Sequence, residues 1–398
     1  MSYVDVMRNP RRWLRILAIV GVTVVAVTLR LRAVDRLPID FDEDDYLLAG
    51  QHYAQALAAW NWGEIVNDDY NFEHPPLPKL AYGLALLPLP PAPPIPELST
   101  SAAPARSLPQ PHFHAARLTA AAFGVLEVLA LAVFDPLAAL FLGIHTWQIK
   151  YTGQIMLEPL PALMSALTVL FYVKGRAEQP GRWNCWLALS AVTLGLTAAS
   201  KYVYCIAGIA ILMDWLWASF AVERPHAIRA VARWLTPVIV WGLISLVVFV
   251  AADPRLWVDP FARLSEAVLY HASYAQSAHV KAAGFPVWQP FVWLSESVPW
   301  HPGVFVVSLD VWISLLAILG APRLWRAPHQ RVFVIWLVGA LGFLTWWTTK
   351  WPQYILILTA PLTVAAAEGF RGLWAPVVAG LRRWRGGGLV EASATPEE

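Results

Sequence analysis

Four consecutive acidic residues, Asp42 to Asp45, precede Tyr46 and form the densest group of potentially catalytic side chains in the sequence. Carboxylates that lie close together and partly buried cannot all ionise cheaply, so the pKa of one of them should rise. A carboxylate in that state is suited to take a proton from a hydroxyl group. The same residues fit the solvated first turn of a helix equally well, because the helix dipole favours acids there. An Asp pair among them could also hold a divalent cation.

A second group follows in the segment Glu73-His74-Pro75-Pro76-Leu77-Pro78-Lys79. The two adjacent prolines restrict the backbone to an extended bend, which would present Glu73 and His74 rigidly. We therefore include Glu73, His74 and Lys79 among the predicted substrate-binding residues. The next apolar stretch, Leu77–Leu89, is short and rich in proline, and we expect it to form a helix at the membrane surface or a re-entrant segment.

The composition places these groups in a membrane protein. Of 398 residues, 58% are hydrophobic and 14% are charged, whereas soluble domains carry about 25% charged residues. The net charge of +2 and the lack of basic clusters interleaved with aromatic residues argue against a nucleic-acid partner. The two cysteines lie in apolar runs and can form neither a disulfide framework nor a cysteine metal site.

A bilayer core about 30 Å thick requires roughly 20 apolar residues per helix. We predict an all-α polytopic fold with about ten transmembrane helices, and several of the candidate spans are short enough to require tilting or local thinning. The spans are Trp13–Leu29, Ala115–Phe134, Pro136–Ile149, Pro159–Val173, Asn184–Ala199, Val203–Val222, Trp234–Ala251, Val304–Leu319, Val332–Thr348 and Tyr354–Phe370.

The arginines orient these spans. Basic residues cluster before the first span, in 174–182, in 224–233, in 323–331 and in 371–385. The positive-inside rule makes all of these segments cytoplasmic when Leu77–Leu89 is not counted as a span. We predict cytoplasmic termini, a single membrane domain over 1–385 and a disordered cytoplasmic tail over 386–398. We expect the protein to reside in a bacterial plasma membrane. Two long loops, 30–114 and 252–303, then lie on the non-cytoplasmic side.

Cations at the outer helix ends are unusual under the same rule. Arg117, Lys150, Lys201 and Lys350 fall there, together with Glu158. Such a set suggests an anion site, because cations can clamp a lipid phosphate or diphosphate and stabilise its departing charge. Single cations that extend to lipid headgroups are the alternative explanation. His271 and several aromatic residues of the second long loop suit either a sugar or the membrane interface.

The order of these segments resembles the GT-C membrane glycosyltransferases, in particular the group of protein O-mannosyltransferases and aminoarabinose transferases. The resemblance covers about residues 30–361. It rests on Asp42-Glu43-Asp44-Asp45-Tyr46, Phe72 to Lys79, Arg117-Leu118-Thr119, Leu157-Glu158-Pro159, Ser200-Lys201-Tyr202, the stretch from Asp253 to Tyr274 with His271, and Lys350 to Tyr354.

The resemblance implies that Asp42 is the catalytic base, with Glu43 in support. It also implies a polyprenyl-phosphate-linked donor of a mannose-like sugar, whose phosphate contacts Arg117, Lys201 and Lys350. Glu158 would orient the donor or the acceptor. We count Tyr202, His271 and Tyr354 among the substrate-binding residues, and we expect the acceptor to be a protein, a lipid or a glycan. In-line attack by its hydroxyl would invert the anomeric carbon.

One departure from the family pattern concerns Gly153, which occupies the place of an arginine five residues before the acid aligned with Glu158. It keeps open the alternative of a catalytically inactive subunit of a membrane complex. A lipid or polyprenyl transporter is the other alternative. Transporters typically have internal repeats, broken helices and ionisable residues deep in their spans, whereas Glu127 and Asp214 are the main deep charges here.

Overall fold

The computed structural model describes residues 10–92, 95, 108–179, 182–218, 228–327 and 329–387, and this part of the chain is helical with no β-strand. The predicted all-α membrane fold is confirmed. Most of the tail predicted to be disordered lies outside the described residues. The first two residues of that tail, Gly386 and Gly387, still belong to the last helix, which ends at Gly387.

Among the residues that the structure describes, four helices are long and apolar enough to cross a bilayer, and three shorter apolar helices accompany them. The four long helices are α2 (Pro10–Arg36), α6 (Gln110–Phe134), α12 (Ile228–Ala252) and α18 (Leu356–Gly387). The shorter ones are α10 (Cys185–Ala198), α11 (Ile206–Ala218) with the preceding 3-10 turn η1 (Tyr202–Cys205), and α17 (Arg331–Trp346). The count of about ten spans stays a prediction.

Glycines allow close packing between several of these helices. A Cβ atom on Gly369 of α18 would lie 2.0 Å from the backbone oxygen of Leu316 in α16 (Asp310–Arg326). A Cβ atom on Gly195 of α10 would lie 2.5 Å from the backbone oxygen of Ser245 in α12. Membrane helices associate through such contacts between small residues, because lipid gives apolar side chains no reason to prefer one another.

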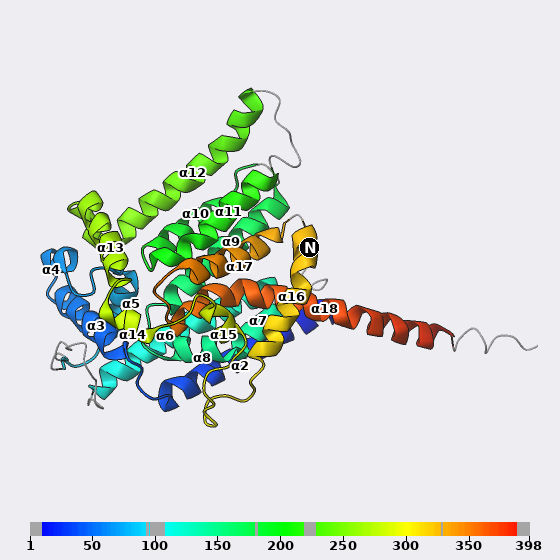
Figure 1. The fold of residues 1–398 in the computed structure, drawn as a ribbon, viewed down its shortest axis with the longest axis horizontal. Helices are drawn as coiled ribbons and strands as arrows, with labels where there is room; N and C mark the ends of the chain where they lie inside the picture. Colours follow the sequence, from blue (N-terminus) through cyan, green and yellow to red (C-terminus); the bar gives the residue numbers. More distant parts are fainter. Residues whose placement is uncertain are drawn as a thin grey trace, which may run out of the picture.

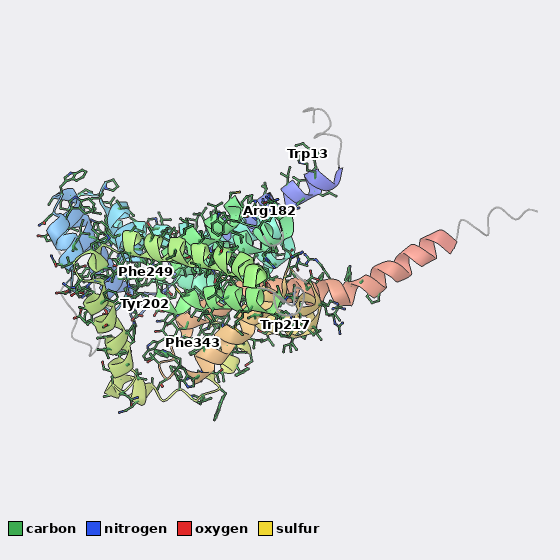
Figure 2. The ribbon with its side chains drawn as sticks, turned by 90° about the horizontal axis from the view of Figure 1, so that it is seen from above. Trp13, Arg182, Tyr202, Trp217, Phe249 and Phe343 are labelled. Atoms are coloured by element: carbon green, nitrogen blue, oxygen red, sulfur yellow. The ribbon has the colours of Figure 1, made fainter. Side chains whose placement is uncertain are left out.

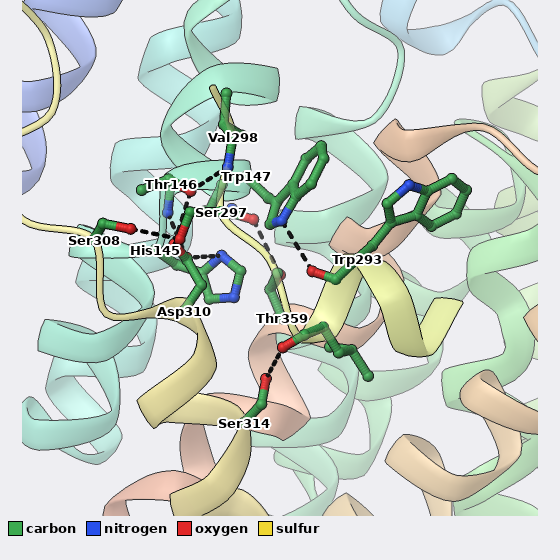
Figure 3. Close-up of polar contacts among 12 residues, drawn as sticks. His145, Thr146, Trp147, Trp293, Ser297, Val298, Ser308, Asp310, Ser314 and Thr359 are labelled. Atoms are coloured by element: carbon green, nitrogen blue, oxygen red, sulfur yellow. Dashed lines mark hydrogen bonds and ion pairs between the residues drawn. The ribbon is translucent and has the colours of Figure 1, made fainter. Parts of the chain in front are cut away.

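The predicted continuous helix over Pro136–Ile149 is wrong, because the chain breaks at His145. The break separates α7 (Pro136–Ile144) from α8 (Thr146–Gly153). Figure 3 shows the cause: Asp310, the first residue of α16, accepts hydrogen bonds from the Thr146 N–H and hydroxyl, both at 2.8 Å. The same carboxylate lies 3.0 Å from His145 Nδ1 and accepts from the Ser297 hydroxyl. This contact with Asp310 stabilises the start of α8 in place of helix continuation.

Most helices of the two long loops gather at one end of the bundle, opposite the end from which α18 extends, whereas α15 lies nearer its middle (Figure 1). The first long loop contributes α3 (Glu43–Ala58), α4 (Trp62–Asn67) and α5 (Leu77–Leu86). The second contributes η3 (Pro254–Trp257), α13 (Pro260–Tyr274), α14 (Ala278–Ala283) and α15 (Gln289–Leu294). The short helix expected at Leu77–Leu89 is therefore present as α5, and it packs against α3 and α6.

Polar contacts join the two long loops. Arg255 Nη1 donates to the carbonyl oxygen of Phe72 at 2.7 Å, and its guanidinium lies over the Phe72 ring. Arg255 and Arg263 both donate to Asp69, at 3.2 and 2.9 Å. In Figure 2, Tyr202 and Phe249 lie toward this end of the molecule, whereas Trp13, Arg182 and Trp217 lie toward the other. The two ends of the bundle thus differ in the side chains they carry.

Candidate active site

A buried ion pair between Glu43 and Arg117 fixes the start of α3. Arg117 Nη2 and Nε donate to the two carboxylate oxygens of Glu43 at 2.6 and 2.8 Å. The backbone N–H groups of Asp40 and Ile155 donate to the same carboxylate, at 2.9 and 2.8 Å. The other donors of Arg117 contact three carbonyl oxygens 2.8–3.0 Å away, those of Val34, Leu37 and Pro38.

This geometry gives Arg117 a different role from the expected phosphate contact. A guanidinium has five N–H groups, and Arg117 directs all five at protein oxygens. A lipid phosphate could be bound only after one of those contacts broke. Arg117 therefore holds the start of the first long loop and the end of α2 against α6, and Glu43 is its charged partner in these contacts.

Asp42 is the next residue along the chain and occupies the N-cap position of α3. Its Oδ2 accepts a hydrogen bond of 3.2 Å from Gln353 Nε2. The pKa of Asp42 is raised to about 7, first by burial and then by repulsion from Glu158, against the lowering effect of the Lys201 charge. A carboxylate with such a pKa changes its protonation state near neutral pH, as a general base requires.

Glu158 and Lys201 form a second buried pair within electrostatic range of Asp42. Glu158 is the N-cap of α9 (Pro159–Glu178), and Lys201 links α10 to η1. Lys201 Nζ donates to Glu158 Oε1 and lies 5.0 Å from the centre of the Tyr354 ring. Glu158 Oε2 is buried without a hydrogen-bond partner in the described structure. The remaining N–H groups of Lys201 can therefore donate to a ligand, and Glu158 Oε2 can accept from one.

Lys150 of α8 forms an ion pair of 2.8 Å with Asp40, close to the same acids. The structure also explains the departure at Gly153, because a Cβ atom there would lie 2.5 Å from the Cβ of Ala33 in α2. No arginine fits at position 153 with the helices this close. Lys150, three residues earlier, supplies a cation in that part of the site.

Glu73, His74 and His271 meet where the two long loops touch. His271 Nε2 donates to the carbonyl oxygen of Glu73 at 3.1 Å. The rings of His74 and His271 are 5.4 Å apart, and His74 Nε2 lies 3.9 Å from Glu73 Oε1. Burial lowers the pKa of both histidines, and the charge of Lys201 lowers the pKa of His74 further. Both rings are therefore neutral at pH 7.

Three other predicted site residues lie outside this group. Lys79 donates to the carbonyl oxygens of Tyr70 and Asn71 at 3.2 and 2.8 Å, and so it stabilises the turn before α5. The Tyr202 ring packs edge-on against Phe249 of α12, with 6.1 Å between centres. Lys350 donates to the carbonyl oxygen of Trp347 and lines a separate pocket.

Sequence analysis missed Gln353, which contacts Asp42 from the far end of the chain. A single amide carries no charge pattern that would have indicated it. Within the part of the chain that the structure describes, no three His, Cys, Asp or Glu side chains form a group able to hold a metal ion. The acids around Asp42 instead pair with lysines: Asp40 with Lys150, and Glu158 with Lys201.

Comparisons with known proteins give the fold. No protein-family model and no curated protein sequence matches the chain. Among solved structures, ArnT from Cupriavidus metallidurans superposes with a TM-score of 0.54 at 17% identity in the apo state, and 0.53 at 16% when bound to undecaprenyl phosphate. The match covers 96% of this chain and 65% of that one.

A second neighbour is the archaeal oligosaccharyltransferase AglB from Archaeoglobus fulgidus, solved with an inhibitory peptide and a dolichol-phosphate. It matches with a TM-score of 0.54 at 13% identity, over 98% of this chain and 53% of that one. The chain therefore spans about two thirds of ArnT and about half of AglB. ArnT and AglB are both GT-C glycosyltransferases, and the described chain has the GT-C membrane fold.

Proposed function

We propose that this protein is a membrane glycosyltransferase that moves a mannose-like sugar from a polyprenyl phosphate to an acceptor hydroxyl on the non-cytoplasmic side. The observation that carries the proposal is Asp42, whose carboxyl has a pKa of about 7 and faces the charges of Glu158 and Lys201. The fold shared with two enzymes solved with polyprenyl or dolichol phosphates supports the choice of donor.

In this mechanism, the acceptor hydroxyl gives its proton to Asp42 as its oxygen attacks the anomeric carbon. The bond between that carbon and the phosphate oxygen breaks on the opposite side, so the anomeric centre is inverted. The leaving phosphate gains negative charge, which a preorganised cation stabilises best. Lys201 has N–H groups beyond the one directed at Glu158 and is our candidate for that cation.

Lys150 can assist from α8, because its ion pair with Asp40 is only partly buried, with 22% of the lysine side chain exposed. Glu158 holds Lys201 in place by accepting a hydrogen bond from its ammonium group. Its second oxygen, Oε2, can accept from a sugar hydroxyl. Glu73, His74 and His271 form the side of the site made by the two long loops, and neutral imidazoles there can exchange hydrogen bonds with a sugar.

The test is turnover of a radiolabelled polyprenyl-phosphate mannose by the purified full-length protein with a mixture of membrane lipids, peptides and glycans as acceptors. Asp42→Asn should reduce turnover by at least about a hundredfold, the usual contribution of a positioned general base. The matched control is Asp35→Asn, because Asp35 lies in the last turn of α2, seven residues before Asp42, with 61% of its side chain exposed. Asp35→Asn should retain wild-type turnover.

Equal turnover by the Asp42→Asn and Asp35→Asn variants would remove Asp42 from the role of base. If the wild-type protein transfers no sugar but moves the labelled lipid across vesicle membranes, the transporter alternative is favoured. Absence of both activities would favour an inactive subunit.

A further inference from the structure

A separate pocket lies beside the candidate active site, between α14 and the residues that follow α17. Its volume is about 270 Å³. Lys281, Lys350, Gln276 and Thr348 contribute polar groups to its lining, and Phe285 and Trp351 contribute rings. A space of this size accommodates a headgroup-sized fragment, since pockets for whole drug-sized ligands measure about 300–1,000 Å³.

The pocket carries uncompensated positive charge. Its lining includes two lysines and no acidic residue. The other outer lysines differ: Lys150 pairs with Asp40, and Lys201 pairs with Glu158. Within the described ranges neither Lys281 nor Lys350 has an ion-pair partner, and Lys350 Nζ donates to the carbonyl oxygen of Trp347. Two lysines that line one concave site favour an anion, since each ammonium group can contact it through a charge-assisted hydrogen bond.

The pocket also adjoins Asp42. Trp351 lines it, and Gln353, two residues further along, donates to Asp42. The His279 ring of α14 lies 5.1 Å from the Trp351 ring and 6.2 Å from the ring of Phe41, which precedes Asp42. A short wall of rings therefore connects the pocket with the proposed base. Glu158 and Lys201 belong to α9 and the α10–η1 junction, which do not line the pocket.

We propose that this pocket binds an anionic group of the acceptor, a phosphate or a carboxylate, and so presents a hydroxyl of the same molecule to Asp42. The assignment to the acceptor rests on the proposed function, because it takes Asp42 as the base and Lys201 as the contact of the donor phosphate. The binding of an anion between Lys281 and Lys350 does not depend on it.

A labelling experiment tests anion binding without turnover. Pyridoxal 5′-phosphate and pyridoxal both form imines with lysine, which borohydride fixes, and only the first carries a phosphate. In the full-length protein in detergent, we expect the ratio of the pyridoxal 5′-phosphate labelling rate to the pyridoxal labelling rate to be about tenfold higher at Lys281 than at a reference lysine, because Lys350 binds the phosphate. Lys174, exposed on α9 outside the pocket, is the internal reference, and its ratio gives the intrinsic difference in reactivity between the two aldehydes. Mass spectrometry reads both sites in the same sample.

The outcomes separate the possibilities. Inorganic phosphate should protect Lys281, chloride at equal ionic strength should not, and Lys350→Met should remove the preference. Equal ratios at Lys281 and Lys174 in the wild-type protein would overturn the site, and that comparison needs no variant. Undecaprenyl phosphate in mixed micelles is compared with inorganic phosphate at the same concentration. If only undecaprenyl phosphate protects Lys281 there, the pocket belongs to the donor and the acceptor assignment is overturned. Failure of the labelling leaves the Asp42 turnover result unaffected.

Discussion

Acidification should inactivate the proposed enzyme at a far higher pH than an ordinary aspartate base would allow. The pKa of Asp42 is about 7, against 3.8 for an unperturbed aspartate. With that pKa the carboxylate is about 90% ionised at pH 8 and about 1% ionised at pH 5, so kcat/KM should fall about 90-fold between them. A base with the ordinary pKa would stay more than about 90% ionised at pH 5. The pKa values of His74 and His271 are lowered, so these two imidazoles do not titrate in the upper part of this pH range.

The assay measures initial transfer rates at low donor concentration from pH 5 to pH 8.5, with recovery of activity at pH 8 as the control for unfolding. Glu158→Gln sharpens the test, because repulsion from Glu158 is the second cause of the raised pKa after burial. That variant also leaves the positive charge of Lys201 unpaired near Asp42, so both effects should move the acid limb to lower pH. A flat profile down to pH 5, or an acid limb displaced upward in Glu158→Gln, would refute the reasoning.

Three stability predictions accompany this one, each read from thermal or denaturant unfolding in detergent. Arg117→Lys should cost about 3–5 kcal/mol, because lysine cannot replace the two-point contact with buried Glu43; an unchanged stability with a raised KM for the donor would restore the phosphate role. Gly153→Ala should cost about 1–3 kcal/mol through its clash with Ala33, and the added change Ala33→Gly should recover most of the loss; no recovery would contradict the helix contact. Asp310→Ala should cost about 3 kcal/mol by leaving the Thr146 N–H without an acceptor, whereas a loss below about 0.5 kcal/mol would mean that the His145 break has another cause.

The membrane class and the place of the acids follow from the sequence, because both depend on local patterns. The low charge content indicates helices in lipid, and Asp42 to Asp45 indicate the start of a helix, which the structure has at Glu43. The break at His145 does not follow in the same way. The run Pro136–Ile149 is apolar throughout, and the Asp310 carboxylate that interrupts it comes from 164 residues further along the chain.

The roles of the cations could not be predicted for a similar reason. Sequence patterns place Arg117, Lys150, Lys201 and Lys350 near one face, but they do not show which oxygens each side chain contacts. Arg117 lies beside three backbone carbonyl oxygens that any sequence would supply. Its charge is therefore used within the fold, although its residue type and position are those of a phosphate ligand.

Charge balance in the described structure separates the cations that organise the site from those open to an additional anion. Arg117 is neutralised by Glu43 and has no donor to spare, whereas Lys150 and Lys201 are neutralised but keep free N–H groups. Neutralised lysines can hold a donor phosphate loosely enough to release it after transfer, since their carboxylate partners compete for the same ammonium groups. Lys281 and Lys350 have no such competitor in their pocket. That pocket therefore suits an anion that stays on the acceptor before and after the reaction. It suits less well a charge that appears only on the leaving group.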